Sequence, residues 1–385
     1  MIHRQLQLFW LLLCRSSSAI VNIANTLLSL VYNLLNVFLK LSSPRKWLAD
    51  QPQKSMENRA RFRLLHLDYV AIREVLNVLD PTDYINFSKV SKACRKLSAI
   101  KKPYKVCLTI LTSSSIMIVN GSITYQIRWT NVKNNYGTRM EWLWWDESRK
   151  YLDRCSENPL DDMKEFYQYA RSLVGVDIDR AVFDMDHFNG KCREIVDWLG
   201  LNFSEMQALC VSGRDQRQEE LQYVLDNVKV KDSLNICAET IEQLPLKIPE
   251  TIQKLCITNG SWITLDYVMS LKMSQLALRD THLTNQDLNE FLKSWMQMKS
   301  HRNLESFETD LTNHEDFPVV GLRGITYKMG PRRPELCPDY TAVGESFEVT
   351  RKDGLQSSIC VFKRETTFVV IMYTRLSRFY DPERI

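Results

Sequence analysis

A short apolar pattern recurs through the middle of the chain and restricts its possible folds more than any other feature. In each copy a leucine is followed two residues later by another apolar residue, and the copies begin at Leu209, Leu234, Leu255 and Leu276, with a weaker one at Leu304. Alternation over such short runs predicts β-strands, and helix-compatible sequence follows each copy. One strand and one helix cannot bury their apolar faces alone, so units of this kind must stack on a shared core.

The clearest of the intervening helices runs from Thr284 to Met298. Thr284 and Asp287 have the spacing of a capping box at its start. Apolar side chains then recur at helical spacing, at Leu288, Phe291, Leu292 and Trp295. Successive copies of the strand pattern begin 21 to 28 residues apart, and a strand plus a helix at this spacing resembles the leucine-rich repeat.

The resemblance to leucine-rich repeats is incomplete. The positions that such repeats fill with Asn or Cys, where the side chain bonds neighbouring backbone, hold Arg214, Glu239, Gly260 and Thr281. We therefore expect a short and irregular leucine-rich-repeat-like α/β region over 201–310. The strands of an ordinary α/β layer remain the alternative.

Strands are also expected on both sides of this region. Within 105–200, alternating runs flank Asn120-Gly121, and within 311–385 they flank Asp353-Gly354; both dipeptides are typical of β-hairpins. The run from Trp142 to Trp145 is interpreted as buried packing, with a binding surface as the alternative. After an irregular loop over 311–344, the end of the chain is predicted to be a short three-stranded β-meander.

The segment 62–104 is predicted to form three short helices. Ile72, Val75, Leu76 and Leu79 follow helical spacing, and the helix stops where Asp80 and Pro81 can cap and begin the next one. Helices in so short a segment bury too little surface to be stable alone. A module of this kind normally keeps an apolar face for a partner.

These helices resemble the F-box. The matching residues are Leu67-Asp68, Val75-Leu76, Leu79-Asp80-Pro81-Thr82-Asp83-Tyr84 and Val90-Ser91-Lys92-Ala93-Cys94-Arg95. Asp68 stands where the F-box has Pro, and Cys94 stands where it has Trp. The order of the remaining segments is similar to nematode-type F-box proteins with a C-terminal, leucine-rich-like F-box-associated domain, in which Arg351-Lys352-Asp353-Gly354 fits the final strand pair.

The resemblance implies a fold and a function. The fold is α+β, with a three-helix F-box, a leucine-rich-repeat-like domain and the terminal meander. The function is to link an unknown protein target, held near residues 234–278, to a Skp-family adaptor and through it to a cullin ubiquitin ligase, without catalysis by this chain. The implied partner-binding residues are Leu67, Val75, Leu76, Leu79, Asp80, Pro81, Tyr84, Val90, Ser91 and Cys94. An interaction module whose degenerate F-box no longer docks is the alternative.

The first 41 residues lie outside this resemblance. From Ser16 to Leu39 the sequence has no charge, and that length can span a bilayer. Its asparagines and Ser29 recur on one helical face, which favours an amphipathic helix on a membrane or a protein. A dispensable extension and a secretory signal remain further alternatives. Residues 42–61 are expected to be an exposed linker.

Composition excludes several classes of function. A net charge of +4 is too small and too dispersed for a nucleic-acid-binding face, although a basic stripe near the F-box leaves a nuclear-import or nucleic-acid site as an alternative. The ten cysteines show no metal-ligand spacing, and several are expected to pack as small apolar residues. They indicate a reducing compartment, cytoplasm or nucleus. The acids between Asp177 and Asp186 are interpreted as a solvated loop, and no motif indicates a cofactor, a metal or an enzyme.

Overall fold

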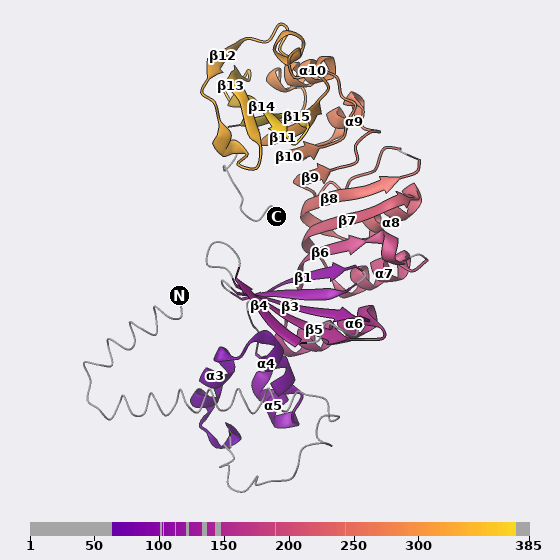
Figure 1. Ribbon diagram of the computed structural model, residues 1–385, viewed down its shortest axis with the longest axis vertical. Helices are drawn as coiled ribbons and strands as arrows, with labels where there is room; N and C mark the ends of the chain where they lie inside the picture. The colour runs from indigo at the N-terminus through magenta and orange to yellow at the C-terminus, as the bar shows by residue number, and fades with distance from the viewer. Residues whose placement is uncertain are drawn as a thin grey trace, which may run out of the picture. The chain divides into compact units, whose positions relative to one another are not determined.

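In the computed structural model the chain forms two compact units, and the boundary between them in the sequence lies between Ala99 and Ile100 (Figure 1). The residues that it describes are 64–100, 102, 104–111, 113–120, 123–132, 137–142, 148–188, 190–242 and 244–374. The apolar segment from Ser16 to Leu39 and the linker at 42–61 lie outside the described residues. Predictions about these segments therefore stay predictions.

The first unit contains a 3-10 turn and three short helices. They are η2 (Leu64–His66), α3 (Tyr69–Val78), α4 (Pro81–Ser88) and α5 (Lys92–Ser98). Each α-helix begins at a side chain that caps it: Asp68, Asp80 and Ser91 accept hydrogen bonds from backbone N–H groups of the first turn. Capping satisfies donors that a helix start otherwise leaves unbonded, so these side chains define where the helices begin.

The second unit is built on one sheet whose centre is parallel. The parallel strands are β1 (Lys105–Ile110), β6 (Ile178–Asp184), β7 (Met206–Gln216), β8 (Val230–Thr240), β9 (Lys254–Ile257), β10 (Gln275–Leu278) and β11 (Ser306–Leu311). The helices that connect them lie along one side of the strands in Figure 1. These are α6 (Pro159–Val174), α7 (Cys192–Asn202), α8 (Gln218–Asn227), α9 (Leu265–Ser270) and α10 (Asn285–Met296).

The recurring leucines form a continuous buried row across the parallel strands. Leu234 is the direct neighbour of Leu209 on one side and of Leu255 on the other, and Leu255 pairs in turn with Leu276. All four side chains are at most 2% exposed. Burial of each leucine contributes about 1.5–3 kcal/mol, so this shared row is what holds successive strands in register.

The parallel run begins earlier than the sequence indicated. Leu108 pairs with Ala181 and Ala181 pairs with Leu209, so the buried row continues across β6 into β1. The prediction of a solvated acidic loop between Asp177 and Asp186 was therefore wrong for most of that segment, which is strand β6. Its charged residues alternate with buried Ala181 and Phe183, and this alternation has the period of a strand.

One connection lacks the helix that was expected. Between β8 and β9 the described residues 244–253 contain no helix. Pro245 and Pro249 explain this, because proline within a helix removes a backbone donor and clashes with the preceding turn. The connection is held instead by Ile252, which is 2% exposed, and by a hydrogen bond from the Thr251 hydroxyl to the Val230 carbonyl.

Further strands extend the sheet at both ends. At one end β2 (Ser115–Asn120), β3 (Ile123–Thr130), β4 (Gly137–Trp142) and β5 (Ser148–Cys155) follow β1. Their pairings are antiparallel except that of β3 with β5, which is parallel. The hairpin predicted at Asn120-Gly121 is confirmed, because Asn120 pairs with Ile123. Trp144 and Trp145 lie outside the described residues, so the interpretation of that aromatic run remains a prediction.

At the other end β13 (Thr341–Thr350), β14 (Gln356–Arg364) and β15 (Thr367–Thr374) form the meander that was predicted, and β15 pairs antiparallel with β11. Gly354 has a φ of 89° in the turn between β13 and β14, a conformation that glycine adopts without strain. The expected loop over 311–344 is more regular than predicted. It contains the π-helical turn η4 (Phe317–Gly321), strand β12 (Tyr327–Gly330) and the 3-10 turn η5 (Pro334–Leu336).

Candidate functional site

Four of the residues predicted to bind a partner are buried inside the first unit. Leu76, Tyr84 and Cys94 are at most 3% exposed, and Pro81 is also buried at the start of α4. The Tyr84 hydroxyl donates a hydrogen bond of 3.0 Å to the Ser98 carbonyl, which links α4 to the end of α5, and burial raises the Tyr84 pKa. These residues support the helices from within and offer a partner little surface.

The two departures from the F-box pattern have clear structural roles. The Asp68 carboxylate accepts a hydrogen bond of 2.9 Å from the Ala71 N–H and so caps α3. Cys94 is 3% exposed, and its backbone N–H donates to the Ser91 hydroxyl. Asp68 therefore caps the start of α3. Cys94 contributes to packing within the unit.

An exposed apolar surface on the first unit was only partly predicted. Val90 is 65% exposed, as suits a docking residue, whereas Leu67, Val75 and Leu79 are half-buried. The most exposed apolar side chains on α3 are residues that sequence reasoning missed. We call this set, together with Leu65 and Val90, the F-box apolar surface: Leu65, Tyr69, Val70, Val78 and Val90.

The missed residues carried a signal in the sequence. Val70 and Val78 are out of phase with Ile72 and Leu76, which face the core of α3, whereas Tyr69 shares their spacing and is exposed at the first position of the helix. An apolar residue outside the core-facing stripe of a helix is exposed by the geometry of the helix. Several such residues on one short helix mark a surface that a partner covers.

The face of the parallel sheet opposite the buried leucines carries a row of small and polar side chains. Cys210, Asn235, Cys256 and Ala277 are direct neighbours across β7 to β10. Cys210 and Cys256 were predicted to pack as small apolar residues. They are half-buried on this open face, because they alternate with buried leucine, valine and isoleucine side chains.

Cys237 is a thiol on the open face whose pKa is lowered. The Cys210 side chain hydrogen-bonds to its sulfur, and the Thr258 side chain and the positive charge of Arg279 act in the same direction, so the pKa of Cys237 is lowered to about 6. The same contact raises the pKa of Cys210. Cys237 is therefore more reactive toward electrophiles than an ordinary thiol at neutral pH.

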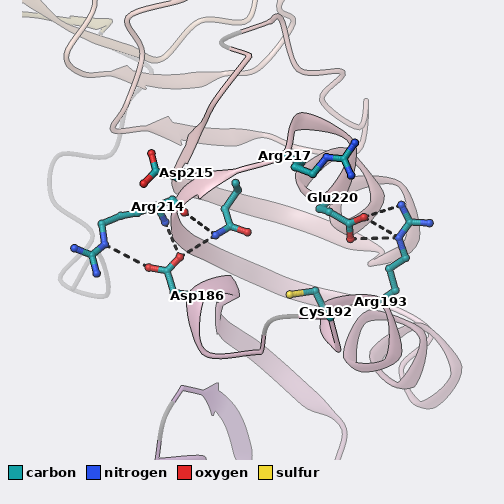
Figure 2. A pocket seen from close by; sticks show the side chains of 9 residues that line it. Asp186, Cys192, Arg193, Arg214, Asp215, Arg217 and Glu220 are labelled. Carbon is teal, nitrogen blue, oxygen red and sulfur yellow. Dashed lines mark hydrogen bonds and ion pairs between the residues drawn. The ribbon is translucent and has the colours of Figure 1, made fainter.

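A polar pocket lies at the carboxyl ends of β6 and β7, beside the starts of α7 and α8 (Figure 2). Its volume is about 700 Å³. At one side the Asp186 carboxylate accepts from the Arg214 N–H at 2.7 Å and from the Gln216 amide at 2.8 Å. The Arg214 backbone donor is the largest cause of the lowered Asp186 pKa.

The opposite side of the pocket holds a second ion pair. Arg193 binds Glu220 through two nitrogens, at 3.0 Å and 2.8 Å, and Figure 2 shows Cys192 between the two pairs. Burial raises the Cys192 pKa, which makes that thiol a weaker nucleophile. The arginines and the acids in the lining largely offset one another, so the pocket presents no strong field to a charged ligand.

Among the described residues, no cluster of three or more histidine, cysteine or acidic side chains is close enough to hold a metal ion. Within the same ranges, no helix combines the length and the apolar character that crossing a bilayer requires.

Comparison with known proteins places two family matches on these units. The F-box domain matches residues 64–106, and a family described as F-box associated matches residues 243–309. The latter segment contains β9, α9, β10 and α10 of the second unit. No solved structure matches the chain.

Curated relatives come from Caenorhabditis elegans. The Skn-1 dependent zygotic transcript 15 protein is 32% identical over 152 residues, which cover 34% of this chain and 41% of that protein. The uncharacterized proteins F59B2.8 and F59B2.9 are each 22% identical, over 35% and 42% of this chain. The matched stretches span only 31% to 41% of the lengths of these relatives.

The F-box and the F-box-associated segment occur in the order expected from the sequence. The chain thus combines an F-box with an F-box-associated segment, and it is similar to nematode proteins over part of its length.

Proposed function

We propose that this chain is the substrate-recognition subunit that links a protein target to a Skp–cullin ubiquitin ligase. The F-box apolar surface carries the proposal, because several exposed apolar side chains on one short helical unit mark a surface that a partner covers. Val70 and Val78 are 68% and 67% exposed. Helix-in-groove packing against an adaptor would bury them, with Val90 contributing from the turn before α5.

Charge on α5 supports the same docking role. Lys92, Arg95 and Lys96 are exposed along this helix, which carries no acidic residue. A basic helix beside an apolar surface favours an adaptor with an acidic rim, since complementary charge speeds association and fixes orientation.

The second unit would hold the target. Its repeated strand and helix units, joined by the buried leucine row, are leucine-rich-repeat-like in this proposal, and the open face of β7 to β10 is a continuous surface of small and polar side chains. A surface of that kind suits an extended protein segment. Catalysis would belong to the enzyme that the ligase recruits, so this chain has no enzymatic role in the proposal.

Binding of the full chain to a purified Skp-family adaptor tests the docking role. Val70→Asp together with Val78→Asp places two charges on the F-box apolar surface and should weaken binding at least a hundredfold, because buried unpaired charges are strongly unfavourable. Leu201→Asp is the matched control, since Leu201 is 87% exposed on α7 of the second unit. It should bind as the unmodified chain does.

The outcomes separate the alternatives. Failure of the unmodified chain to bind any Skp-family adaptor would overturn the ligase role and favour an interaction module that does not dock. Equal binding by the double variant and the control would keep adaptor binding but remove the F-box apolar surface as its site.

A further inference from the structure

Strand β12 forms one edge of the large sheet and is exposed along its length. It pairs with β13 on one side, from Tyr327 opposite Val349 to Gly330 opposite Ser346. Among the described residues, no strand pairs with its other side, because β12 ends the strand order (Figure 1). An unpaired edge presents backbone donors and acceptors that can accept another strand.

Apolar side chains border this edge on one face of the sheet. Tyr327 and Met329 lie opposite Val349 and Phe347, and side chains of directly paired residues project from the same face. Val349 and Phe347 are buried at 1% and 8% exposure, whereas Tyr327 and Met329 are 38% and 54% exposed. The core face of the sheet therefore continues onto β12 without a cover.

A third exposed apolar residue belongs to the same surface. The Phe347 ring contacts the Tyr327 ring at 5.2 Å on one side and the Phe317 ring at 6.3 Å on the other. Phe317 begins η4, and that turn carries Val319, which is 67% exposed. We call Val319, Tyr327 and Met329 the β12 apolar rim.

The exposed charges of β12 and of the turn before it are cationic, and the acid Glu348 lies directly opposite Lys328 on β13. From 317 to 334 the sequence contains four cationic residues and no acid. Arg323 and Lys328 are exposed, and neither makes an ion pair with another described side chain.

We propose that β12 is a docking edge for an extended acidic peptide, which adds to the sheet as a further strand. Backbone hydrogen bonds to the free side of β12 would give affinity, and alternate side chains of the peptide would reach the β12 apolar rim. Acidic residues between them would lie near Arg323 and Lys328. This inference rests on the proposed function, since the peptide would be a segment of the recruited target.

Charge favours this occupant over the obvious alternatives. A second copy of the chain would bring two basic edges together, which is unfavourable. A nucleic acid requires a broad basic surface to neutralise many phosphates, whereas this segment has only four cations and one of them, Arg333, already pairs with Glu335 and Glu348. A short acidic strand satisfies both the charge and the apolar side chains.

Fluorescence anisotropy with the full chain tests the proposal. The probe is a labelled twelve-residue peptide of alternating glutamate and valine, and its lysine–valine counterpart serves as the charge control. The acidic peptide should bind and the basic peptide should not. Arg323→Glu with Lys328→Glu should weaken binding roughly tenfold or more. The double variant loses two attractive charge pairs with the peptide and replaces them with two repulsive ones. Lys229→Glu, on an exposed residue elsewhere, should leave it unchanged.

Two further measurements identify the mode of binding. Amide hydrogen exchange should slow in residues 327–330 when the acidic peptide is bound, and Met329→Asp should abolish both the protection and the binding. Equal binding of the two peptides, or equal effects of the charge reversal and Lys229→Glu, would overturn the proposal. So would concentration-dependent dimerisation that Lys328→Glu removes, or tighter binding of a single-stranded oligonucleotide at the same residues.

The test stands apart from the test of the ligase role. If the acidic peptide does not bind while the full chain still binds a Skp-family adaptor, the docking edge is wrong and the proposed function stands. If adaptor binding fails while the acidic peptide protects β12, the edge remains a target-binding site in a protein without ligase docking.

Discussion

Truncation of Leu255 tests the buried leucine row directly. Leu255 is 2% exposed and lies between Leu234 and Leu276 on the neighbouring strands. Leu255→Ala removes most of a fully buried side chain. Leu234 and Leu276 are held by their own strands, so they cannot move in to fill the cavity. Substitutions of this kind cost about 2–5 kcal/mol, with the higher values where the cavity stays open. We expect Leu255→Ala to lower the free energy of unfolding of the second unit by about 3 kcal/mol or more.

The neighbouring residue supplies a matched control. Cys256 follows Leu255 on the same strand but is half-buried on the open face, so Cys256→Ala should cost less than about 1 kcal/mol. Urea unfolding followed by tryptophan fluorescence reports on the second unit, which contains Trp129, Trp198, Trp262 and Trp295. Equal losses in the two variants would refute the register and the assignment of the two faces.

Three further predictions follow from local interactions. Ser91→Ala removes the cap of α5 and should lower the stability of the first unit by about 1 kcal/mol, measured by amide hydrogen exchange in α5, whereas Ser91→Asp should retain it. The Asp353 pKa is lowered to about 2, chiefly by the hydrogen bond from Arg351. The stability that this pair contributes should therefore be present above about pH 4 and be lost as the pH falls toward 2. Acid unfolding of Asp353→Asn should lack this pH dependence. Cys237 should react with iodoacetamide faster than Cys256 at pH 7, as measured by mass spectrometry of the labelled peptides. The reaction of Cys237 should slow below about pH 6, where its thiolate is protonated. Cys210→Ala should remove much of the difference between the two rates.

The buried leucines were predictable because one residue type marks both the strand and its core face. Strand β6 was not, since Ala181 and Phe183 replace the leucine pattern and charged residues flank them, at Asp179, Arg180 and Asp184. The alternation was present in the sequence, but the density of acids favoured a loop. Pairing with β1 and β7 on both sides overrides that local preference.

The missing asparagine ladder is partly replaced in a way that fixed spacing could not reveal. Gly260 occupies an expected asparagine position, and the residue before it, Asn259, donates a hydrogen bond of 2.9 Å to the Cys237 carbonyl on the neighbouring strand. Thr281 occupies another such position, and its hydroxyl bonds to that of Thr309 at 3.0 Å. A shift of one residue thus preserves a bond to neighbouring backbone although the motif fails.

The motif around Arg351 shows a structural role that the resemblance alone did not explain. The Arg351 guanidinium is 6% exposed, binds Asp353 through two nitrogens at 3.0 Å and 2.7 Å, and lies 5.3 Å from the centre of the Trp295 ring. It also donates to the Arg302 carbonyl. This side chain therefore fastens the hairpin of β13 and β14 to the end of α10, a contact between residues far apart in the sequence.

For the candidate site, sequence identified the F-box helices but not their outer surface. Leu76 and Tyr84 fit the family pattern because they form the core of the unit, and Cys94 is buried there in place of the Trp of that pattern. Tyr69, Val70 and Val78 are outside that pattern. Helix geometry accounts for the exposure of Val70 and Val78, whereas the exposure of Tyr69 at the first position of α3 is seen only in the structure. The pattern therefore predicts how the unit folds better than it predicts what a partner touches.

The most direct test of the central claim is hydrogen exchange of the full chain with and without a purified Skp-family adaptor. We predict that the adaptor slows exchange in residues 65–79 and 90–98, which contain the F-box apolar surface and α5, and leaves exchange in β7 to β10 unchanged. Protection confined to the second unit, or no protection at adaptor concentrations that saturate other F-box proteins, would contradict the account.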